Sequence, residues 1–253
     1  MANLDVLTYG FSFVSDQGLF GWSTVSLVTM GETRILVDTG PASRKPLVFK
    51  ALQAKGLEPA DIDVVILAHL HWDHSQNADM FSNARIVVNA RELDYARRPN
   101  PADLHMAKPV ADMVAKMKVN PVDDGDRIMD GLSVISTPGH TKGHMSVIAE
   151  LDGERVLVAG DAMPDGGTLK RGIPYNVFWD VSDARDSVQK IRSSSDVFCP
   201  GHDRPFRLEN NEVKYLHGPT KVEVWTSNEG GAPSSLTYTV HAVRPANIDI
   251  VQK

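Results

Sequence analysis

Short apolar runs that end in turn-forming residues recur along the chain. Runs of this kind, rich in valine and isoleucine, are typical of buried β-strands. Asp152 and Gly153, which separate two of the runs, predict a hairpin turn because both residue types tolerate positive φ angles. The predicted strands lie within residues 23–30, 34–40, 63–69, 84–90, 132–140, 145–151, 155–161 and 196–202.

Between several of these runs, apolar residues recur every three or four positions, which is the period of an amphipathic helix. Gly56 is a natural C-terminal stop, Ser182 is a candidate N-cap, and Pro109 should kink or break the helix that contains it. Strands that alternate with helices favour an α/β fold in which helices cover the sheets. The predicted helices lie at residues 46–56, 101–118 and 182–191.

The C-terminal residues have a different pattern. The stretches "TKVEVWTS" and "SLTYTVHAV" alternate between apolar and polar residues, as strands do, and the turn-rich "NEGGAPS" joins them. We expect residues 1–253 to form one domain, with a core at about 24–203 and a β-rich extension at 206–253. The extension can close a sheet edge or build a subunit contact, so a homodimer is one of the two alternatives that the sequence leaves undecided.

Composition narrows the class of protein. The chain has 253 residues, of which 42% are hydrophobic, and a formal net charge of −6. This charge argues against nucleic acid as the partner, because phosphate binding needs a basic face. No apolar run approaches the roughly 20 residues of a membrane span, and the N-terminus lacks the pattern of a signal peptide. Because Cys199 is the one cysteine, we expect a cytoplasmic protein without internal disulfides.

Four of the strand runs end in side chains that bind metals. The stretch "HLHWDH" follows the run at 63–69, and three other runs end in "TPGH", "GD" and "PGH". Loops at one rim of a rigid sheet can bring such side chains together. The candidate ligands are His69, His71, Asp73, His74, His140, Asp161 and His202.

Five imidazoles and two carboxylates suit Zn²⁺, and also Fe or Mn. A mononuclear catalytic zinc needs three protein ligands, so seven fit two divalent ions that share one carboxylate. His69 and His71 are two residues apart and should point the same way, whereas Asp73 and His74 follow after the chain turns. The pattern therefore predicts a binuclear metal site.

The motifs "HLHWDH", "TPGHTKGH", "GD" and "PGHD", with "ILVDTG" before them, resemble those of the metallo-β-lactamase superfamily. The resemblance implies an αβ/βα four-layer sandwich, in which two mixed β-sheets pack face to face and helices lie on the outer faces. Asp38 of "ILVDTG" would orient one of the ligands. The first metal would take His69, His71 and His140, the second Asp73, His74 and His202, and Asp161 would bridge both.

Within the superfamily, the helical segment at 91–118 between ligand motifs looks most like the N-acyl homoserine lactonase branch. The resemblance implies a hydrolase that uses a metal-bridging hydroxide to open a lactone or cleave a carboxylic ester. His71 stands where the diiron flavoproteins carry Glu, which disfavours that redox branch. The alternatives are a glyoxalase II-like thioesterase, another binuclear hydrolase acting on phosphoesters or β-lactams, an iron-dependent persulfide dioxygenase, and a non-catalytic metal- or partner-binding protein.

One departure from the lactonase pattern concerns substrate binding. Lactonases commonly carry a Tyr three residues after the bridging Asp, and Pro164 occupies that position here. Tyr175 is a candidate replacement, with packing as its alternative role. Asp73 can orient the nucleophile and carry its proton in addition to binding a metal. We therefore predict Asp73 and Tyr175 as catalytic residues.

The loops around the motifs are rich in aromatic residues and methionine, which favours a small apolar or ring-containing substrate. Lys170 and Arg171 can meet a substrate carboxylate, although solvated charges are the simpler interpretation. Cys199 lies in an apolar run and is expected in the core rather than in catalysis. The pocket candidates, many of which we also expect in the ordinary core, are Phe11, Phe13, Phe20, Trp22, Met106, Met113, Met117, Tyr175, Phe178 and Trp179.

Overall fold

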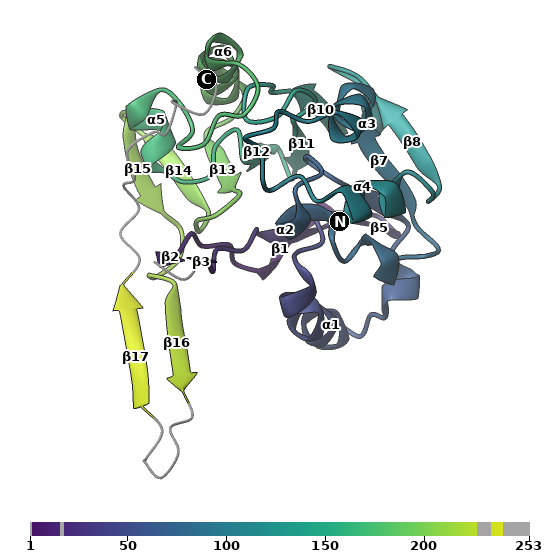
Figure 1. Ribbon diagram of the computed structural model, residues 1–253, viewed down its shortest axis with the longest axis horizontal. Coiled ribbons are helices and arrows are strands. Elements are labelled where there is room, and N and C mark those ends of the chain that lie inside the picture. The colour runs from purple at the N-terminus through teal and green to yellow at the C-terminus, as the bar shows by residue number, and fades with distance from the viewer. Residues whose placement is uncertain (1, 16–17, 227–233, 240–253) are drawn as a thin grey trace.

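Two mixed β-sheets form the centre of the molecule, and the computed structural model describes residues 2–15, 18–226 and 234–239. Figure 1 shows the sheets side by side with helices around them. The first sheet has the order β1 (Ala2–Thr8), β4 (Val25–Met30), β5 (Thr33–Val37), β6 (Val64–Ile66), β7 (Arg85–Asn89) and β8 (Val119–Val122). The second has the order β15 (Glu212–Tyr215), β14 (Phe206–Glu209), β13 (Val197–Pro200), β12 (Glu154–Gly160), β11 (Met145–Leu151), β10 (Leu132–Ser136) and β9 (Arg127–Met129).

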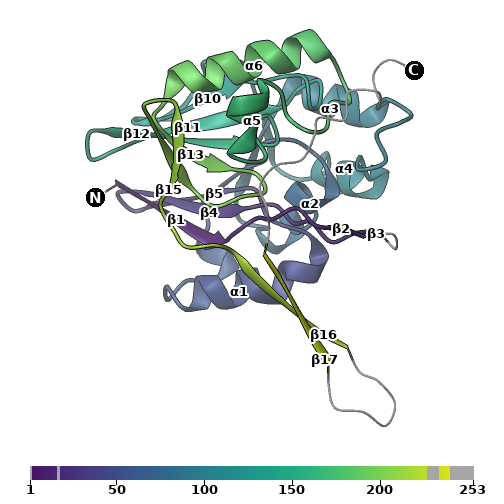
Figure 2. The same ribbon diagram turned by 90° about the vertical axis from the view of Figure 1, so that its left-hand side faces the viewer.

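Helices cover the outer face of each sheet, which gives four layers (Figure 2). The first sheet packs on α1 (Lys45–Gln53), α3 (Ala90–Arg97) and α4 (Lys108–Val114), and the second on α5 (Gly167–Arg171) and α6 (Val181–Ser194). This arrangement confirms the predicted αβ/βα sandwich. Short elements connect these layers, namely α2 (Trp72–Ser75), η1 (Ala42–Arg44), η2 (Pro59–Asp61), η3 (Ala78–Met80) and the hairpin of β2 (Val14–Ser15) and β3 (Gly18–Leu19).

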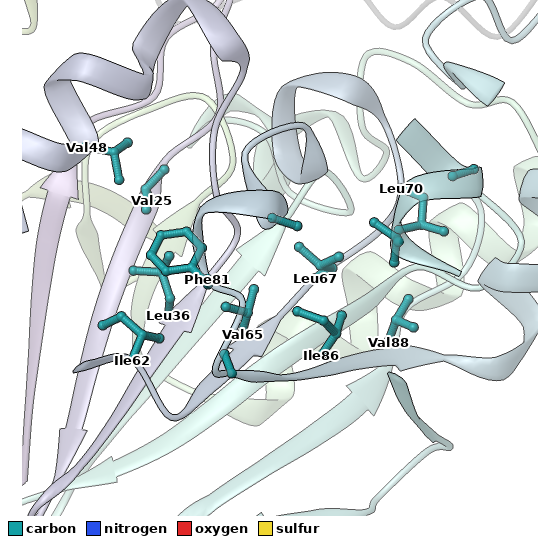
Figure 3. Packing of buried hydrophobic residues seen from close by; sticks show 14 of the residues in the cluster. Val25, Leu36, Val48, Ile62, Val65, Leu67, Leu70, Phe81, Ile86 and Val88 are labelled. Carbon is teal, nitrogen blue, oxygen red and sulfur yellow. The ribbon is translucent and has the colours of Figure 1, made fainter. Parts of the chain in front are cut away.

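The strands of the first sheet are apolar on both faces because both faces are covered. In β5, Ile35 and Val37 contact the second sheet, while Leu36 between them faces the helices. The same alternation continues in β6, where Val65 lies on the helix side. Figure 3 shows Leu36 and Val65 packed together with Val48 of α1. A strand buried on both faces keeps a fixed register, which fixes the loops at its end.

Each of the eight runs predicted as strands overlaps one strand, and the turn at Asp152 and Gly153 has the expected positive φ angles of 48° and 87°. The helix predicted over 101–118 is wrong in its first half, because α4 begins at Lys108 and residues 101–107 form a loop. Pro109 lies in the first turn of α4, where its missing N–H costs no hydrogen bond.

Two further predictions are corrected or extended. The N-cap of α6 is Asp180 rather than Ser182, because the Asp180 side chain accepts the Asp183 N–H. After residue 206, β14 and β15 extend the second sheet, whereas β16 (Lys221–Thr226) and β17 (Ser234–Thr239) pair only with each other in the described part of the chain. In both views this hairpin projects from the body (Figures 1 and 2). The "NEGGAPS" turn lies outside the described residues.

No helix in the described ranges combines the length and the apolar composition that a bilayer crossing would need.

Candidate metal centre

The predicted ligands lie at one edge of the two sheets, where four strands end. His69 follows β6 by three residues, and His71 is the N-cap of α2, whose first turn carries Asp73 and His74. On the second sheet, the loops or turns after β10, β12 and β13 carry the other three, His140, Asp161 and His202. Strands that end at the same edge thus bring together residues up to 133 positions apart in the chain, from 69 to 202.

The side chains form three overlapping groups whose ligand atoms lie within 4.8 Å of one another. Asp161 lies between the histidines of the two sheets. Its Oδ1 is 3.3 Å from His74 Nε2, and its Oδ2 is 3.2 Å from His202 Nε2 and 3.5 Å from His140 Nε2. The groups are His69, His71 and His140; His69, His74 and Asp161; and Asp73, His74 and His202.

Several of these polar atoms are buried and have no hydrogen-bond partner among the described residues. Both ring nitrogens of His69 are in this position, and so are His74 Nε2 and Asp161 Oδ1, which lie 3.3 Å apart without the geometry of a hydrogen bond. Burying such groups without a partner is costly, and a cation that accepts their lone pairs removes the cost. Burial also lowers the pKa of His69 well below its usual value, which favours the neutral imidazole that metals bind. The residues present therefore fit a divalent metal site.

Four of the five candidate ligand histidines are oriented by partners on the ring nitrogen that points away from the centre, and for His202 this partner is the Phe11 carbonyl, 3.4 Å from Nδ1. His74 Nδ1 lies 2.7 Å from Asp38 Oδ2, whose other oxygen accepts the Ala68 N–H at 2.8 Å. His140 Nδ1 lies 2.9 Å from the carbonyl of Asn176. A partner of this kind fixes the tautomer and the ring orientation of a ligand. Asp38 thus has the orienting role that the resemblance implied.

His71 has an orienting partner that the sequence did not reveal. Its Nε2 lies 3.0 Å from Asp103 Oδ2, so Nδ1 faces the centre, 3.0 Å from His140 Nε2. The Tyr95 hydroxyl donates to the same Asp103 oxygen at 2.8 Å. Burial opposes ionisation of Asp103, but His71 and Tyr95 outweigh it and lower its pKa to about 2. Asp103 therefore faces His71 as a carboxylate.

His144, the second histidine of "TPGHTKGH", is buried beside the centre but is not an eighth ligand. Its Nε2 accepts the backbone N–H groups of Asp161 at 2.9 Å and Ala162 at 3.2 Å, and its Nδ1 pairs with Thr137 Oγ1 at 2.8 Å. Gly160 has a φ of 55°, and a Cβ there would lie 2.7 Å from His144 Nε2. The His144 imidazole therefore holds the turn that carries Asp161, and it comes so close to the backbone that only glycine fits at position 160.

Glu92 of α3 supports the loops that carry the histidines. It is fully buried and accepts the backbone N–H of Leu70 at 3.0 Å, the Gly143 N–H at 2.9 Å and the Thr141 hydroxyl at 2.8 Å. These donors come from both sheet-edge loops. No local motif marked this residue, because its partners are distant in sequence.

A small pocket opens over the centre. Its volume is about 50 Å³, and five of the candidate ligands form part of its wall. Phe13 and Tyr175 also line it, and the Tyr175 side chain is only 5% exposed. Since a water needs about 10–15 Å³ of such space, the pocket takes a small polar group and not a whole large ligand.

The remaining sequence-predicted pocket residues divide between wall, core and surface. Phe178 is buried with its ring against His71 and His140, while Phe20 and Trp179 are partly exposed. The expectation of a methionine-lined pocket is wrong, because Met106 is buried in the cluster on the helix side of the first sheet, and Met113 and Met117 are partly buried and pack against that cluster. Phe11 and Trp22 pack edge to face, with ring centroids 4.8 Å apart, instead of lining the pocket.

Lys170 and Arg171 do not line the pocket. Arg171 is mostly buried and donates to Asp165 Oδ1 at 2.6 Å, so it is neither a substrate contact nor a solvated charge. Lys170 is exposed. Cys199 is in the core between the sheets, as expected, and burial raises the pKa of its thiol to about 12.

Comparisons with known proteins agree with this geometry. Residues 20–202 match the family described as the metallo-beta-lactamase superfamily. The chain is 31% identical over 211 residues to metallo-beta-lactamase domain-containing protein 1 of Xenopus laevis, covering 81% of this chain and 82% of that protein. It is 26% identical over 198 residues to an N-acyl homoserine lactonase of Bacillus thuringiensis, covering 76% and 72%. Among solved structures, AidC, a dizinc quorum-quenching lactonase in complex with the product N-hexanoyl-L-homoserine, has a TM-score of 0.62 at 18% identity, covering 80% and 82%.

Proposed function

The chain belongs to the metallo-β-lactamase superfamily, and from this premise we propose that it is a hydrolase with two divalent metal ions that opens a lactone or cleaves a carboxylic ester. The observation that carries the proposal is the place of Asp161, whose two carboxylate oxygens face histidines of both sheets. A single carboxylate in this position can be shared by two ions. The likeness to N-acyl homoserine lactonases supports the bond type.

We assign the ligands by the groups that converge. His69, His71 and His140 would hold one ion, and Asp73, His74 and His202 the other, with Asp161 between them. Imidazole and carboxylate ligands without thiolate suit Zn²⁺ best, with Fe or Mn as alternatives. The dizinc lactonase of the same fold supports zinc. Bound divalent cations would lower the pKa of a water molecule in the site and polarise a carbonyl oxygen.

The chain's own residues then bind the substrate and handle the proton. Asp73 lines the pocket, with its Oδ2 3.4 Å from His202 Nε2. It can orient a water molecule in the pocket and take the proton that this water loses. Tyr175 lines the same pocket and would donate its hydroxyl hydrogen to the substrate carbonyl. Pro164 offers no hydroxyl, and its carbonyl is used to accept the His202 N–H at 2.8 Å.

The pocket also indicates the size of the group that reacts. Its wall combines Phe13 and Leu19 with the polar ligands, so one side is apolar. Because the enclosed space is small, we propose a small-molecule substrate whose carbonyl enters while the remainder stays outside. Hydrolysis of a thioester, a phosphodiester or a β-lactam would need the same metals, so the assay must include these three substrates as well.

The proposal is tested by metal analysis together with a substrate panel. Purified protein should contain two metal ions per chain and hydrolyse a lactone or ester faster than a thioester, a phosphodiester or a cephalosporin. His71→Ala should lower the metal content and reduce hydrolysis by about 100-fold or more, because it removes a proposed ligand together with the contact that orients it on Asp103. His217→Ala is the matched control, since His217 is exposed and does not line the pocket.

Two results would refute parts of this proposal. A protein that holds only one ion when saturated with Zn²⁺ contradicts the shared role of Asp161. Preference for one of the other three substrates moves the enzyme to that class of hydrolase and leaves the metal assignment intact.

A further inference from the structure

One imidazole in the pocket wall has no place in the proposed ligand set. His105 lines the pocket together with His71 and Asp161, yet it belongs to none of the three ligand groups found in the described residues. It lies in the loop before α4, the stretch that the sequence pattern wrongly assigned to a helix. The loop thus carries a polar side chain to the substrate side of the centre.

The backbone of His105 is anchored on both sides. Its N–H donates to Asp103 Oδ1 at 3.2 Å, while the other oxygen of that carboxylate holds His71. Its carbonyl accepts the Trp72 N–H at 3.2 Å, one residue after His71. The same carboxylate therefore positions a proposed metal ligand and a pocket residue, which fixes the distance between them.

The ring of His105 is held by packing and leaves its polar atoms available. Its centroid lies 5.5 Å from that of His71 and 5.4 Å from that of Phe178. The side chain is partly exposed, and neither ring nitrogen makes a hydrogen bond to another residue in the described ranges. Phe178 also stacks on His140, so the aromatic packing joins His105 to the centre. Such a ring has a fixed place and two ring nitrogens that the other described residues leave available for hydrogen bonds.

We infer that His105 is a substrate-binding residue, which donates a hydrogen bond to an oxygen of the ester or lactone group held over the metals. This inference rests on the proposed hydrolase function, and it names a second polar contact where Pro164 removes the expected one. Tyr175 and His105 would then provide the polar contacts of the substrate that do not come from metal ligands. The product carboxylate would make the same contact as the substrate.

The test compares His105→Phe with the wild-type protein, both loaded with two equivalents of Zn²⁺. Phenylalanine keeps the ring contacts with Phe178 and removes the nitrogens. A hydrogen bond to a charged group contributes about 1.5–3 kcal/mol, so the Kd for hexanoate measured by calorimetry should rise by about tenfold or more. For the lactone or ester that the wild type hydrolyses best, kcat/KM should fall by roughly 10- to 100-fold. His217→Phe should change neither quantity.

A second variant guards against a purely structural effect. His105→Asn retains an amide that can donate, and it should recover part of the hexanoate affinity. The zinc content should stay at two per chain in both variants, because His105 is not a ligand. Hexanoate affinity and kcat/KM within twofold of wild type in His105→Phe would overturn the inference. If the wild type hydrolyses no probe, the proposed function fails, while the hexanoate comparison still decides the role of His105.

Discussion

At the scale of single residues, a substitution of Tyr175 tests whether this residue takes part in catalysis or only in packing. Its ring is nearly buried in the pocket wall, and Tyr175→Phe keeps the ring while removing the hydroxyl. If the hydroxyl polarises the substrate carbonyl, kcat should fall by about 100-fold while the thermal midpoint stays within a few degrees. Tyr9→Phe is the control, because Tyr9 stacks on His217 away from the pocket. Wild-type kinetics in Tyr175→Phe would assign the residue to packing alone.

Single residues also show what the sequence can predict about a site. The convergence of the seven candidate ligands was predictable because each follows an apolar run within a short motif, and the place of Asp38 was predictable because it ends such a run itself. Asp103 and His105 were not, because nothing near them in sequence signals a contact with His71, 32 residues away from Asp103. Orienting partners of this kind come into contact only when the chain folds, so the structure is needed to identify them.

At the scale of elements, α3 acts as a support for the site through Glu92. Glu92→Ala would leave the buried Leu70 and Gly143 N–H groups without an acceptor. Each unpaired group costs about 1–3 kcal/mol, so the free energy of unfolding should fall by about 2–6 kcal/mol in urea denaturation. Asp94→Ala on the same helix is the control, because Asp94 is exposed and forms a surface ion pair with exposed Arg97. A loss below about 0.5 kcal/mol in Glu92→Ala, the range of ordinary surface changes, would contradict this role.

The sequence predicted well the strands with two apolar faces and the helices with one apolar stripe. It predicted poorly the segment at 101–107, whose backbone conformation depends on tertiary contacts. The pattern at 101–118 has helical spacing throughout, but residues 101–107 are drawn into a loop. Asp103 in that loop is buried, with its carboxylate on His71 and Tyr95, and a continuous helix would not deliver it there. Pro109 then begins α4 instead of interrupting it. Here a side-chain contact outweighs the local helical preference.

At the scale of the whole molecule, the site is where the two sheets meet. The order of the strands within each sheet could not be read from the chain, because each sheet contains both antiparallel and parallel neighbours, and β1 pairs with β4 although the hairpin of β2 and β3 lies between them in the sequence. What the sequence did predict was the convergence of strand ends, since every ligand motif follows a strand. The family resemblance supplied the layering, and the packed clusters on both sides of each sheet account for it.

Because His69 and His74 follow the first sheet while His140, Asp161 and His202 follow the second, metal binding should tie the two halves together. A ligand that binds only the folded state at 100 times its Kd stabilises that state by about 2.7 kcal/mol per site. For a chain of this size, removal of the metal by a chelator should lower the thermal midpoint by roughly 5–10 °C per site. Calorimetry with and without chelator measures this shift, and adding Zn²⁺ back should restore it.

Asp161→Asn tests whether the shared carboxylate is the link. The amide is uncharged and cannot supply two anionic oxygens to two ions, so both sites should bind zinc more weakly and the shift caused by the chelator should shrink. The turn that carries residue 161 should persist, because His144 holds it through the backbone N–H groups of residues 161 and 162. If the chelator leaves the midpoint of the wild type unchanged, the two sheets are held by their apolar interface alone. If it shifts Asp161→Asn by as much as the wild type, the metals bind without the shared carboxylate and the bridging assignment is wrong.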